Sequence, residues 1–273
     1  MISAIVLTKN EEKIIGFCLK NLRWCDEVLV IDDYSEDKTT AISKRLGARV
    51  FKRKLDGNYA KQRNFGLKKA KGDWVLFIDA DEIVNESLKK EILKNINFEI
   101  GDSCRQGREI CAYKLKRKDK FLGKWLRFGE TSRVELLRLA KKNKGAWQKP
   151  VHEVWQIKGE IGKLKNPIIH NREITIADFL TKINHYSSLR AKELYRKRVR
   201  TNAFLIMVYP GAKFFQNYFL RWGFLDGKEG FVMAVMMAIH SFLVRAKLYL
   251  LWQNKGEEEF KIPALKELYK KYG

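Results

Sequence analysis

The chain has 273 residues, of which 45% are hydrophobic and 12% aromatic, so it is too apolar for a disordered basic protein and long enough to bury a sizeable core. Its formal net charge of +23 at pH 7 calls for a polyanionic neighbour, either nucleic acid or an anionic lipid surface. Four cysteines with no Cys-x-x-Cys pair suggest neither a zinc site nor a disulfide framework.

Strand and helix signals alternate over the first hundred residues. Apolar, β-rich runs occur at residues 5–7, 28–31, 49–51 and 74–78. Helical stretches lie between them at residues 11–23, 36–46 and 59–70. This alternation predicts βαβ units and a largely parallel sheet. Because the chain opens directly on the first strand without a basic leader, no signal peptide is predicted.

Polar residues follow three of these strands. They are Thr8 to Glu11, Asp32 to Ser35, and Asp79 with Asp81 and Glu82. Ligands of parallel sheets bind at the carboxyl ends of the strands, so these residues are expected to border one cleft. Asp79 and Asp81 alternate along a strand end and can converge on Mg2+ or Mn2+, cations often held together with substrate phosphates. The alternative is a helix-capping loop with an aspartate at the N-cap.

The rest of the chain divides less sharply. Residues 101–120 are interpreted as a polar excursion, and residues 121–155 as mixed strand and loop. From Ile176 the chain turns helical, and residues 181–221 hold nine basic residues against one acid. We therefore expect an α/β domain at 1–175 and a basic, aromatic helical region at 176–273. The longest unbroken apolar run, Phe231 to Ile239, is far shorter than the roughly 20 residues of a membrane span.

Basic residues beside aromatic ones are typical of the membrane interface, where cations meet anionic headgroups and rings lie at the water boundary. The helical region is therefore predicted to bind an anionic membrane surface peripherally. The alternative is that its helices pack as an ordinary core and their charges are solvated.

Four motifs occur in order and at fitting intervals. They are Leu7-Thr8-Lys9-Asn10-Glu11, Asp32-Asp33-Tyr34-Ser35, Ala60-Lys61-Gln62-Arg63-Asn64-Phe65-Gly66 and Asp79-Ala80-Asp81-Glu82. Together they resemble the serial motifs of family 2 glycosyltransferases with the GT-A fold, over roughly residues 1–175. Further on, Gly223-Phe224-Leu225-Asp226-Gly227 and Arg245-Ala246-Lys247 are similar to the carboxyl-terminal part of lipopolysaccharide core glucosyltransferases of the WaaE type. The resemblance implies an α/β, Rossmann-like, mostly parallel sheet flanked by helices, with a C-terminal helical, membrane-proximal extension.

The resemblance also implies roles in binding a nucleotide-sugar donor. Thr8 and Asp33 are expected to hold the nucleoside, with Asp32 as the alternate partner and Glu11 beside them, and Arg63 to lie near the diphosphate together with Asp79. Each role has a structural alternative. Asp32 and Asp33 can cap the next helix, Glu11 can balance a helix dipole, and Arg63 can be a solvated side chain on a lysine-rich helix.

For the cation, Asp81 is the expected direct ligand of Mg2+ or Mn2+, with Asp79 as a second ligand and His170 as a third. A structural role for His170 is the alternative, because imidazole is a less natural Mg2+ ligand than carboxylate. Residues 151–153 look like a Val-His-Glu signature. This implies that Glu153 is the catalytic base and that His152 orients it or touches the donor, the alternative being an ion pair between Glu153 and a nearby lysine.

Three tryptophans, Trp125, Trp147 and Trp155, can stack on a sugar but are also ordinary core residues. The resemblance implies an inverting, metal-dependent enzyme that moves a hexose, with glucose from UDP-glucose as the favoured donor, onto a lipid-linked or lipopolysaccharide-type glycan. It is expected in the cytoplasm, at the inner membrane face. A protein side chain is the alternative acceptor. A nucleic-acid partner is suggested by charge alone, and no motif supports one.

Overall fold

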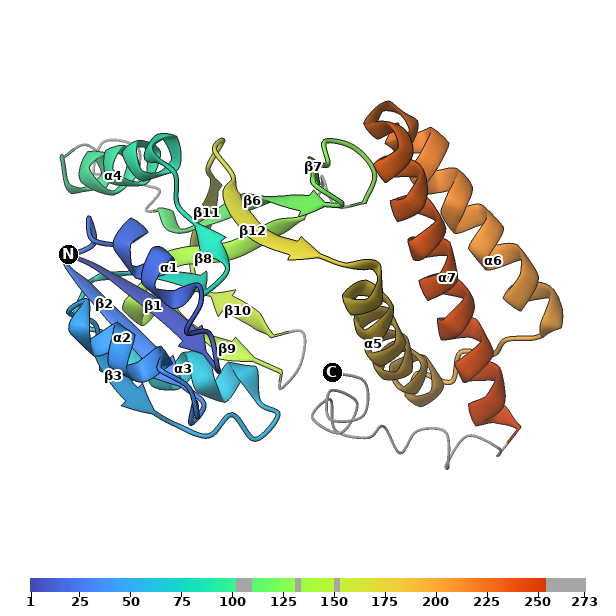
Figure 1. Cartoon of the computed structure of the whole chain (residues 1–273), viewed down its shortest axis with the longest axis horizontal. Helices are drawn as coiled ribbons and strands as arrows, with labels where there is room; N and C mark the ends of the chain where they lie inside the picture. Colours follow the sequence, from blue (N-terminus) through green and yellow to red (C-terminus); the bar gives the residue numbers. More distant parts are fainter. Residues whose placement is uncertain (102–109, 131–133, 150–152, 254–273) are drawn as a thin grey trace. The chain divides into compact units, whose positions relative to one another are not determined.

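The computed structural model describes residues 1–101, 110–130, 134–149 and 153–253 (Figure 1). The chain forms two compact units. The first comprises Met1–Asp119 and Arg133–Arg172, and the second comprises Lys120–Ser132 and Glu173–Gly273. The sequence suggests a boundary at residue 175, close to the point between Arg172 and Glu173 where the chain passes from the first unit to the second. It does not single out the segment 120–132.

The first unit begins with four parallel strands in the order β3-β2-β1-β4. These strands are β1 (Ile2–Thr8), β2 (Glu27–Asp32), β3 (Arg49–Lys52) and β4 (Trp74–Asp79). They are connected by the helices α1 (Ile15–Asn21), α2 (Thr39–Arg45) and α3 (Tyr59–Lys69). This is the predicted βαβ arrangement, and the α/β fold with helices beside the sheet is confirmed (Figure 1).

The sheet then continues with strands of the opposite direction. β8 (Glu135–Lys141) pairs antiparallel with β4 and with β6 (Ile110–Phe121), and β12 (Ile168–Ile174) pairs with β5 (Glu82–Ile83). The remaining elements of the first unit are β9 (Gly145–Gln148), β10 (Val154–Ile157), β11 (Glu160–Lys163) and α4 (Glu86–Gly101), whereas β7 (Lys124–Trp125) pairs with β6 from the segment assigned to the second unit. Among the described residues the sheet is therefore mixed, parallel in its first half.

The interpretation of residues 101–120 as a polar excursion is wrong for residues 110–120, while residues 102–109 lie outside the described residues. Residues from Ile110 onward form β6, a long strand within the sheet. Cys111, Ala112, Tyr113 and Leu115 are buried along it, whereas Lys116 is exposed. The second half of this strand is rich in lysine and arginine, so the segment looks polar by composition although it has buried apolar positions.

Alternate side chains of the central strands fill two cores, one on each face of the sheet. One core contains Ala4, Val6, Val30, Leu76 and Ile78, and the other contains Ile5, Leu29, Ile31, Val75 and Phe77. The second core also holds Trp147 and Trp155, whose rings stack with centroids 5.2 Å apart. Both indoles are buried, so these two tryptophans are core residues rather than an open sugar platform.

The second unit is mainly helical. It contains α5 (Ile176–Arg196), α6 (Ala203–Phe215), a π-helical turn (Gln216–Leu220), a 3-10 turn (Gly223–Asp226) and α7 (Gly227–Trp252). Lys247 of α7 fastens this helix to α5, because its Nζ donates to the backbone oxygen of Asn184 at 2.7 Å and to Ser187 Oγ at 2.9 Å. Arg245 of α7 lies 3.7 Å from the ring centroid of Tyr209 on α6.

The segment 120–132 is held to the helices by a buried carboxylate. Asp226 accepts hydrogen bonds from the backbone N–H of Arg127 at 3.0 Å and of Phe128 at 2.9 Å. Beside this contact, Phe121 and Leu126 pack against Met233 of α7. Asp226 belongs to the Gly-Phe-Leu-Asp-Gly motif, so one function of that motif is to join this segment to α7.

One stretch among the described residues, Gly223–Trp252, has the length and apolar composition of a membrane-crossing helix. The core helices of many globular proteins meet the same criterion. The apolar run Phe231 to Ile239 lies within this stretch, and Arg245 and Lys247 interrupt the apolar sequence after it.

Candidate active site

The strand register brings the predicted nucleoside-binding residues to one edge of the sheet. β1 and β2 pair Thr8 with Asp32, and β1 and β4 pair Leu7 with Asp79. Thr8 Oγ1 donates to Asp32 Oδ1 at 3.3 Å, and both residues are buried. The ends of β1, β2 and β4 therefore lie side by side at the edge where ligands of such sheets bind, and the side chains of Thr8 and Asp32 are in contact there.

The two aspartates after β2 do not cap a helix. Residue Lys38 occupies the N-cap of α2, and Asp32 instead accepts from the backbone N–H of Ser35 at 2.9 Å. Asp33 accepts from the backbone N–H of Leu55 at 2.9 Å and pairs with Lys9. The capping alternative is therefore wrong, and both carboxylates shape the turn at the sheet edge.

Two buried arginines hold Asp79. Arg138 of β8 donates to Asp79 Oδ2 at 2.5 Å and to Glu82 Oε1 at 3.0 Å. Arg63 of α3 donates from Nη2 to Asp79 Oδ1 at 3.2 Å. Because Arg63 is only 4% exposed and lies over the ring of Trp147, the alternative of a solvated helix arginine is wrong.

The charges of this cluster shift the pKa values of its two carboxyl groups, Asp79 and Glu82. Burial alone would raise the pKa of Asp79, but the guanidinium groups of Arg138 and Arg63 hold it well below its usual range. Burial raises the pKa of Glu82, and the neighbouring Asp79 raises it further, against the attraction of Arg138. Asp79 is therefore an ionised carboxylate whose two oxygens are both occupied by arginine.

Glu153 lies beside the same cluster. Arg63 Nε donates to Glu153 Oε1 at 3.0 Å, so one guanidinium bridges Asp79 and the predicted base. The ion pair expected as the alternative role of Glu153 thus exists, with an arginine rather than a lysine. His152 lies outside the described residues.

Asp81 and His170 come together as the cation hypothesis requires. His170 Nε2 lies 3.2 Å from Asp81 Oδ2, and its Nδ1 lies 3.0 Å from Asp119 Oδ1. The second contact has ion-pair distance without hydrogen-bond alignment. Burial lowers the pKa of His170, but the carboxylates of Asp119 and Asp81 outweigh it and raise this pKa to about 9. His170 is thus neither isolated nor part of an apolar core.

The alternative of a capping loop at Asp79 and Asp81 is wrong as well. Helix α4 begins only at Glu86, and Asn85 caps it by accepting from the backbone N–H of Leu88 at 2.9 Å. Between Asp81 and the start of α4 lies the short strand β5, in which Glu82 pairs with His170 of β12. Asp81 is therefore held at the sheet edge by strand pairing.

The Asp81 carboxylate fits a divalent cation that shares its shell with a diphosphate, whereas His170, with its raised pKa, would have to release a proton before it could bind the cation. No group of three or more His, Cys, Asp or Glu that can hold a metal exists within the described part of the chain. Mg2+ and Mn2+ commonly take one or two protein ligands plus substrate phosphates. The Asp119 carboxylate beside His170 Nδ1 is the kind of partner that orients a metal-binding imidazole.

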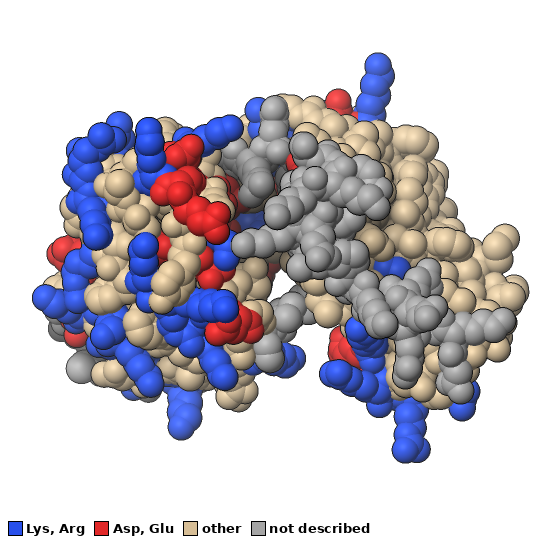
Figure 2. Space-filling model, turned by 60° about the horizontal axis from the view of Figure 1, so that its bottom comes forward, with Lys and Arg blue, Asp and Glu red and all other residues tan. Residues whose placement is uncertain are grey.

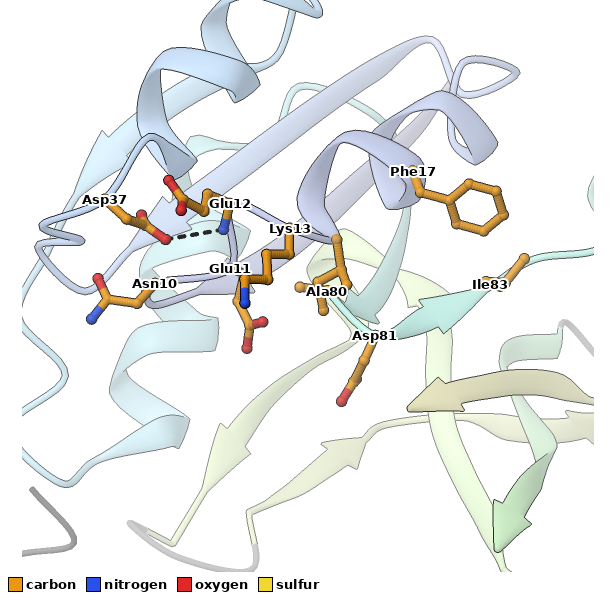
Figure 3. A pocket seen from close by; sticks show the side chains of 10 residues that line it. Asn10, Glu11, Glu12, Lys13, Phe17, Asp37, Ala80, Asp81 and Ile83 are labelled. Atoms are coloured by element: carbon orange, nitrogen blue, oxygen red, sulfur yellow. Dashed lines mark hydrogen bonds between the residues drawn. The ribbon is translucent and has the colours of Figure 1, made fainter. Parts of the chain in front are cut away.

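A cavity of about 580 Å³ opens at this edge (Figure 3). It is lined by Asn10, Glu11, Glu12, Lys13, Ile14, Phe17, Asp37, Ala80, Asp81 and Ile83. Figure 3 shows Asn10, Glu12 and Asp37 at one end and Phe17 and Ile83 at the other, with Asp81 bordering the space between. Glu11 precedes α1 and its side chain lines this cavity, so it is not a residue of the helix's first turn.

Sequence reasoning missed three residues of the site. Arg138 carried a visible signal, because it is a single charge among leucines in a strand-like run. Glu82 was noted in its motif without a role, and it organises the site by accepting from the backbone N–H of Asp79 at 2.9 Å. Asp119 lies among lysines and arginines, where nothing in the sequence distinguishes it.

Comparisons with known proteins agree on one family. The model of glycosyl transferase family 2 matches residues 3–140. The lipopolysaccharide core biosynthesis glycosyltransferase LpsC of Rhizobium meliloti (strain 1021) is 27% identical, over 91% of this chain and 92% of LpsC. An uncharacterized glycosyltransferase of Rickettsia felis is 31% identical, over 90% of this chain and 89% of its own length.

Solved structures resemble the chain more distantly. Glucosyl-3-phosphoglycerate synthase from Mycobacterium tuberculosis, in complex with Mn2+, UDP and phosphoglyceric acid, is 18% identical with a TM-score of 0.45. The match covers 72% of this chain and 78% of that one.

Proposed function

The chain belongs to glycosyl transferase family 2, and from this membership we propose that it is an inverting, metal-dependent enzyme that moves a hexose from UDP-hexose, with glucose favoured, onto a lipid-linked or lipopolysaccharide-type glycan. One observation supports this above the others. Asp79 at the end of β4 is bound by Arg63, which also bonds Glu153, and Asp81, two residues further along the chain, contacts His170.

The donor's nucleoside is assigned to the edge formed by Thr8, Asp32 and Asp33, with Glu11 at the cavity beside it. Carboxylates can accept hydrogen bonds from the ribose hydroxyls or from the base. Asp32 is fully buried and Asp33 nearly so, which holds both in fixed positions before a ligand arrives. This preorganisation supports binding without a cost for ordering these side chains.

The cation is assigned to Asp81 and His170. When bound, it would neutralise the diphosphate leaving group. Asp79 is given an indirect role, because its oxygens already accept from Arg138 and Arg63. Its charge keeps both guanidinium groups in place near the expected diphosphate.

Glu153 is assigned as the base. In the proposed reaction the acceptor hydroxyl oxygen forms a bond to the anomeric carbon, and Glu153 takes the hydroxyl proton. The bond from that carbon to the diphosphate oxygen breaks, and the electron pair leaves with the nucleotide. Arg63 fixes the direction of the Glu153 carboxylate through its 3.0 Å hydrogen bond, and it is therefore a positioning residue.

The acceptor is inferred from relatives and from the second unit. The printed name of LpsC assigns that protein to lipopolysaccharide core biosynthesis, and the Gly-Phe-Leu-Asp-Gly segment is similar to WaaE-type glucosyltransferases. The basic and aromatic helices support a cytoplasmic enzyme that is associated peripherally with the anionic inner face of the membrane. A glycan carried on lipid would be presented at that surface.

A donor screen tests this proposal. Purified protein is incubated with a panel of UDP-sugars, with and without Mg2+ or Mn2+, and binding and release of UDP are measured. We expect one UDP-hexose to bind and to be hydrolysed slowly in the presence of cation. If no nucleotide sugar binds or is hydrolysed under any of these conditions, the proposed donor chemistry is wrong.

The acceptor is tested separately by mass spectrometry of the products. A mass increase of one hexose on a lipid-linked glycan supports the proposal. The same increase on a protein side chain would instead establish the alternative acceptor.

A further inference from the structure

An apolar stripe runs along the exposed side of α6 and the turn after it. It is formed by Phe204, Met207, Val208, Gly211, Ala212, Phe215 and Phe219. These positions repeat at three- and four-residue steps, which place them on one face of a helix. In a helix that meets water this face carries polar residues, so the pattern of α6 is inverted.

The exposure of this α6 stripe is large. Phe204 is 70% exposed and Met207 is 77% exposed, and α6 contains no buried residue. The exposed apolar surface continues beyond the helix through Leu220, Trp222 and Leu225. Contiguous surfaces of this kind mark sites that contact another protein or a membrane.

The charges near α6 are directed away from the stripe. The sole charged residue in the sequence of α6, Lys213, is paired with Glu130 at a distance of 2.8 Å. Arg245 lies against the ring of Tyr209 on α6, where it faces the helical unit rather than the stripe. Exposed cations instead flank α6 in the sequence, with Arg198 and Arg200 before it and Lys228 after it.

This arrangement of apolar face and flanking cations matches an anionic bilayer surface. Aromatic residues such as Phe219 and Trp222 are typical of the boundary between headgroups and acyl chains, and the flanking cations complement anionic headgroups. On the face shown in Figure 2, the helical unit presents a broad area without charged side chains, with several basic side chains at its lower end and one that projects from its upper edge.

The length of α6 determines how it can enter a bilayer. Its 13 residues extend about 20 Å, too short for the hydrocarbon core of about 30 Å. Pro210 lies within the helix and disfavours its extension as a straight span. Helix α7 is longer, but Lys247 and Arg245 fasten it to α5 and α6.

We propose that the α6 stripe inserts into one leaflet of an anionic membrane, with α6 lying in the plane of the interface. This inference rests on the membrane-bound acceptor of the proposed function and adds a defined element and a mode of binding. Attachment then has an apolar component that salt does not screen, in addition to the attraction of the basic residues.

Vesicle sedimentation tests the proposal with the whole chain. The variant combines Phe204→Ser, Met207→Ser and Phe215→Ser, and the matched control combines Leu180→Ser with Tyr186→Ser, exposed apolar residues of α5 in the same unit. Vesicles contain phosphatidylglycerol, and binding is measured at low salt and at about 1 M NaCl, where the Debye length is about 3 Å.

We expect the unmodified chain and the control to stay bound at high salt, and the α6 variant to lose binding by at least about tenfold per apolar side chain removed. Equal binding of the variant and the unmodified chain would overturn the proposal, as would equal losses in the variant and the control. A stable dimer without vesicles that the α6 variant abolishes would also overturn it, because a second copy would then cover the stripe.

Release of UDP from a soluble UDP-sugar is measured on the same samples. It is expected to be the same in the α6 variant and in the unmodified chain, because no stripe residue is assigned to the catalytic machinery. An absence of hydrolysis in all samples, with salt-resistant binding intact, would count against the donor chemistry and not against insertion.

Discussion

Replacing Arg138 by methionine tests the electrostatic organisation of the site. The guanidinium is 6% exposed and contacts Asp79 Oδ2 at 2.5 Å and Glu82 Oε1 at 3.0 Å. Removing one partner of a buried ion pair typically costs about 3–5 kcal/mol, because the remaining charge is left without compensation. Arg63 still pairs with Asp79 in the variant, so Glu82 bears most of this loss.

Arg138→Met is therefore expected to lower the free energy of unfolding by about 3–5 kcal/mol at neutral pH. Arg138→Lys keeps the positive charge but loses the planar guanidinium that bonds both carboxylates. We expect it to lower the free energy of unfolding by an intermediate amount of about 1–3 kcal/mol. The control is Lys163→Met, because Lys163 pairs with Glu135 at 3.0 Å but is 67% exposed. An exposed pair of this kind contributes about 0–1 kcal/mol.

The pH dependence gives a second readout. In the unmodified chain the pKa of Asp79 is depressed, so its contribution is present above the unfolded value near 3.9 and is lost as the pH falls. In Arg138→Met the buried carboxyl group of Glu82 lacks its cation and takes up a proton more readily. The difference in stability between the two proteins should therefore narrow as the pH falls toward about 4.

Urea unfolding followed by intrinsic fluorescence measures these differences, since Trp147 and Trp155 are buried in the same unit. A loss in Arg138→Met no larger than that in Lys163→Met would refute the buried-cluster reasoning. A large loss that Arg138→Lys reproduces in full would show that the geometry of the guanidinium, rather than the charge, is decisive.

Three further outcomes are expected. Asp81→Asn should weaken Mn2+-dependent binding of the nucleotide sugar, as isothermal titration with and without Mn2+ would show; undiminished cation dependence would exclude Asp81 as a ligand. Glu153→Gln should lower kcat by about 10²–10⁴-fold with binding of the donor retained, measured as UDP release in the presence of acceptor, and full activity would exclude it as the base. Gly66→Ala should destabilise the first unit by about 1–3 kcal/mol, because the added Cβ would lie 2.8 Å from Ile5 Cγ2. Gly16→Ala is the control and should not destabilise it, because the nearest atom to its Cβ would lie at 3.5 Å. Equal unfolding curves for the two variants would contradict the close packing of α3 on the sheet.

The first half of the fold could be predicted from the sequence because its signals are local. The strands at Val28 and Trp74 are apolar runs separated by helical periodicity, and the polar residues after them fall at strand ends by the geometry of a parallel sheet. The predicted helix at 11–23 is shorter in the structure, Ile15–Asn21, because the residues before it form the loop that borders the cavity.

The antiparallel half could not be predicted in the same way. β6 carries its apolar residues among lysines and arginines, and its neighbours in the sheet, β8 and β12, are distant in the sequence. For the same reason the partners of the site residues were hidden. Arg138 meets Asp79, and Asp119 meets His170, only after strand pairing that no local pattern specifies.

The roles expected from the resemblance are consistent with this geometry to different degrees. Asp81 and His170 are in contact, and Arg63 touches the carboxylate of Glu153. The burial of Arg63 was not foreseen, because three lysines on the same helix suggest a solvated face. Its position over the ring of Trp147 depends on β9, which is far from α3 in the sequence.

The segment 120–132 can complete its contacts only after the helices that cover it have been synthesised. Phe121 and Leu126 are covered by Met233, and the backbone of Arg127 is satisfied by Asp226. The ribosome adds these helical residues roughly 100 positions later, which corresponds to about 5–20 s of synthesis. During that interval the nascent segment displays apolar side chains without their cover, and a chain truncated at residue 175 would display them permanently. Expression of the first 175 residues alone is accordingly a poor route to the isolated catalytic unit.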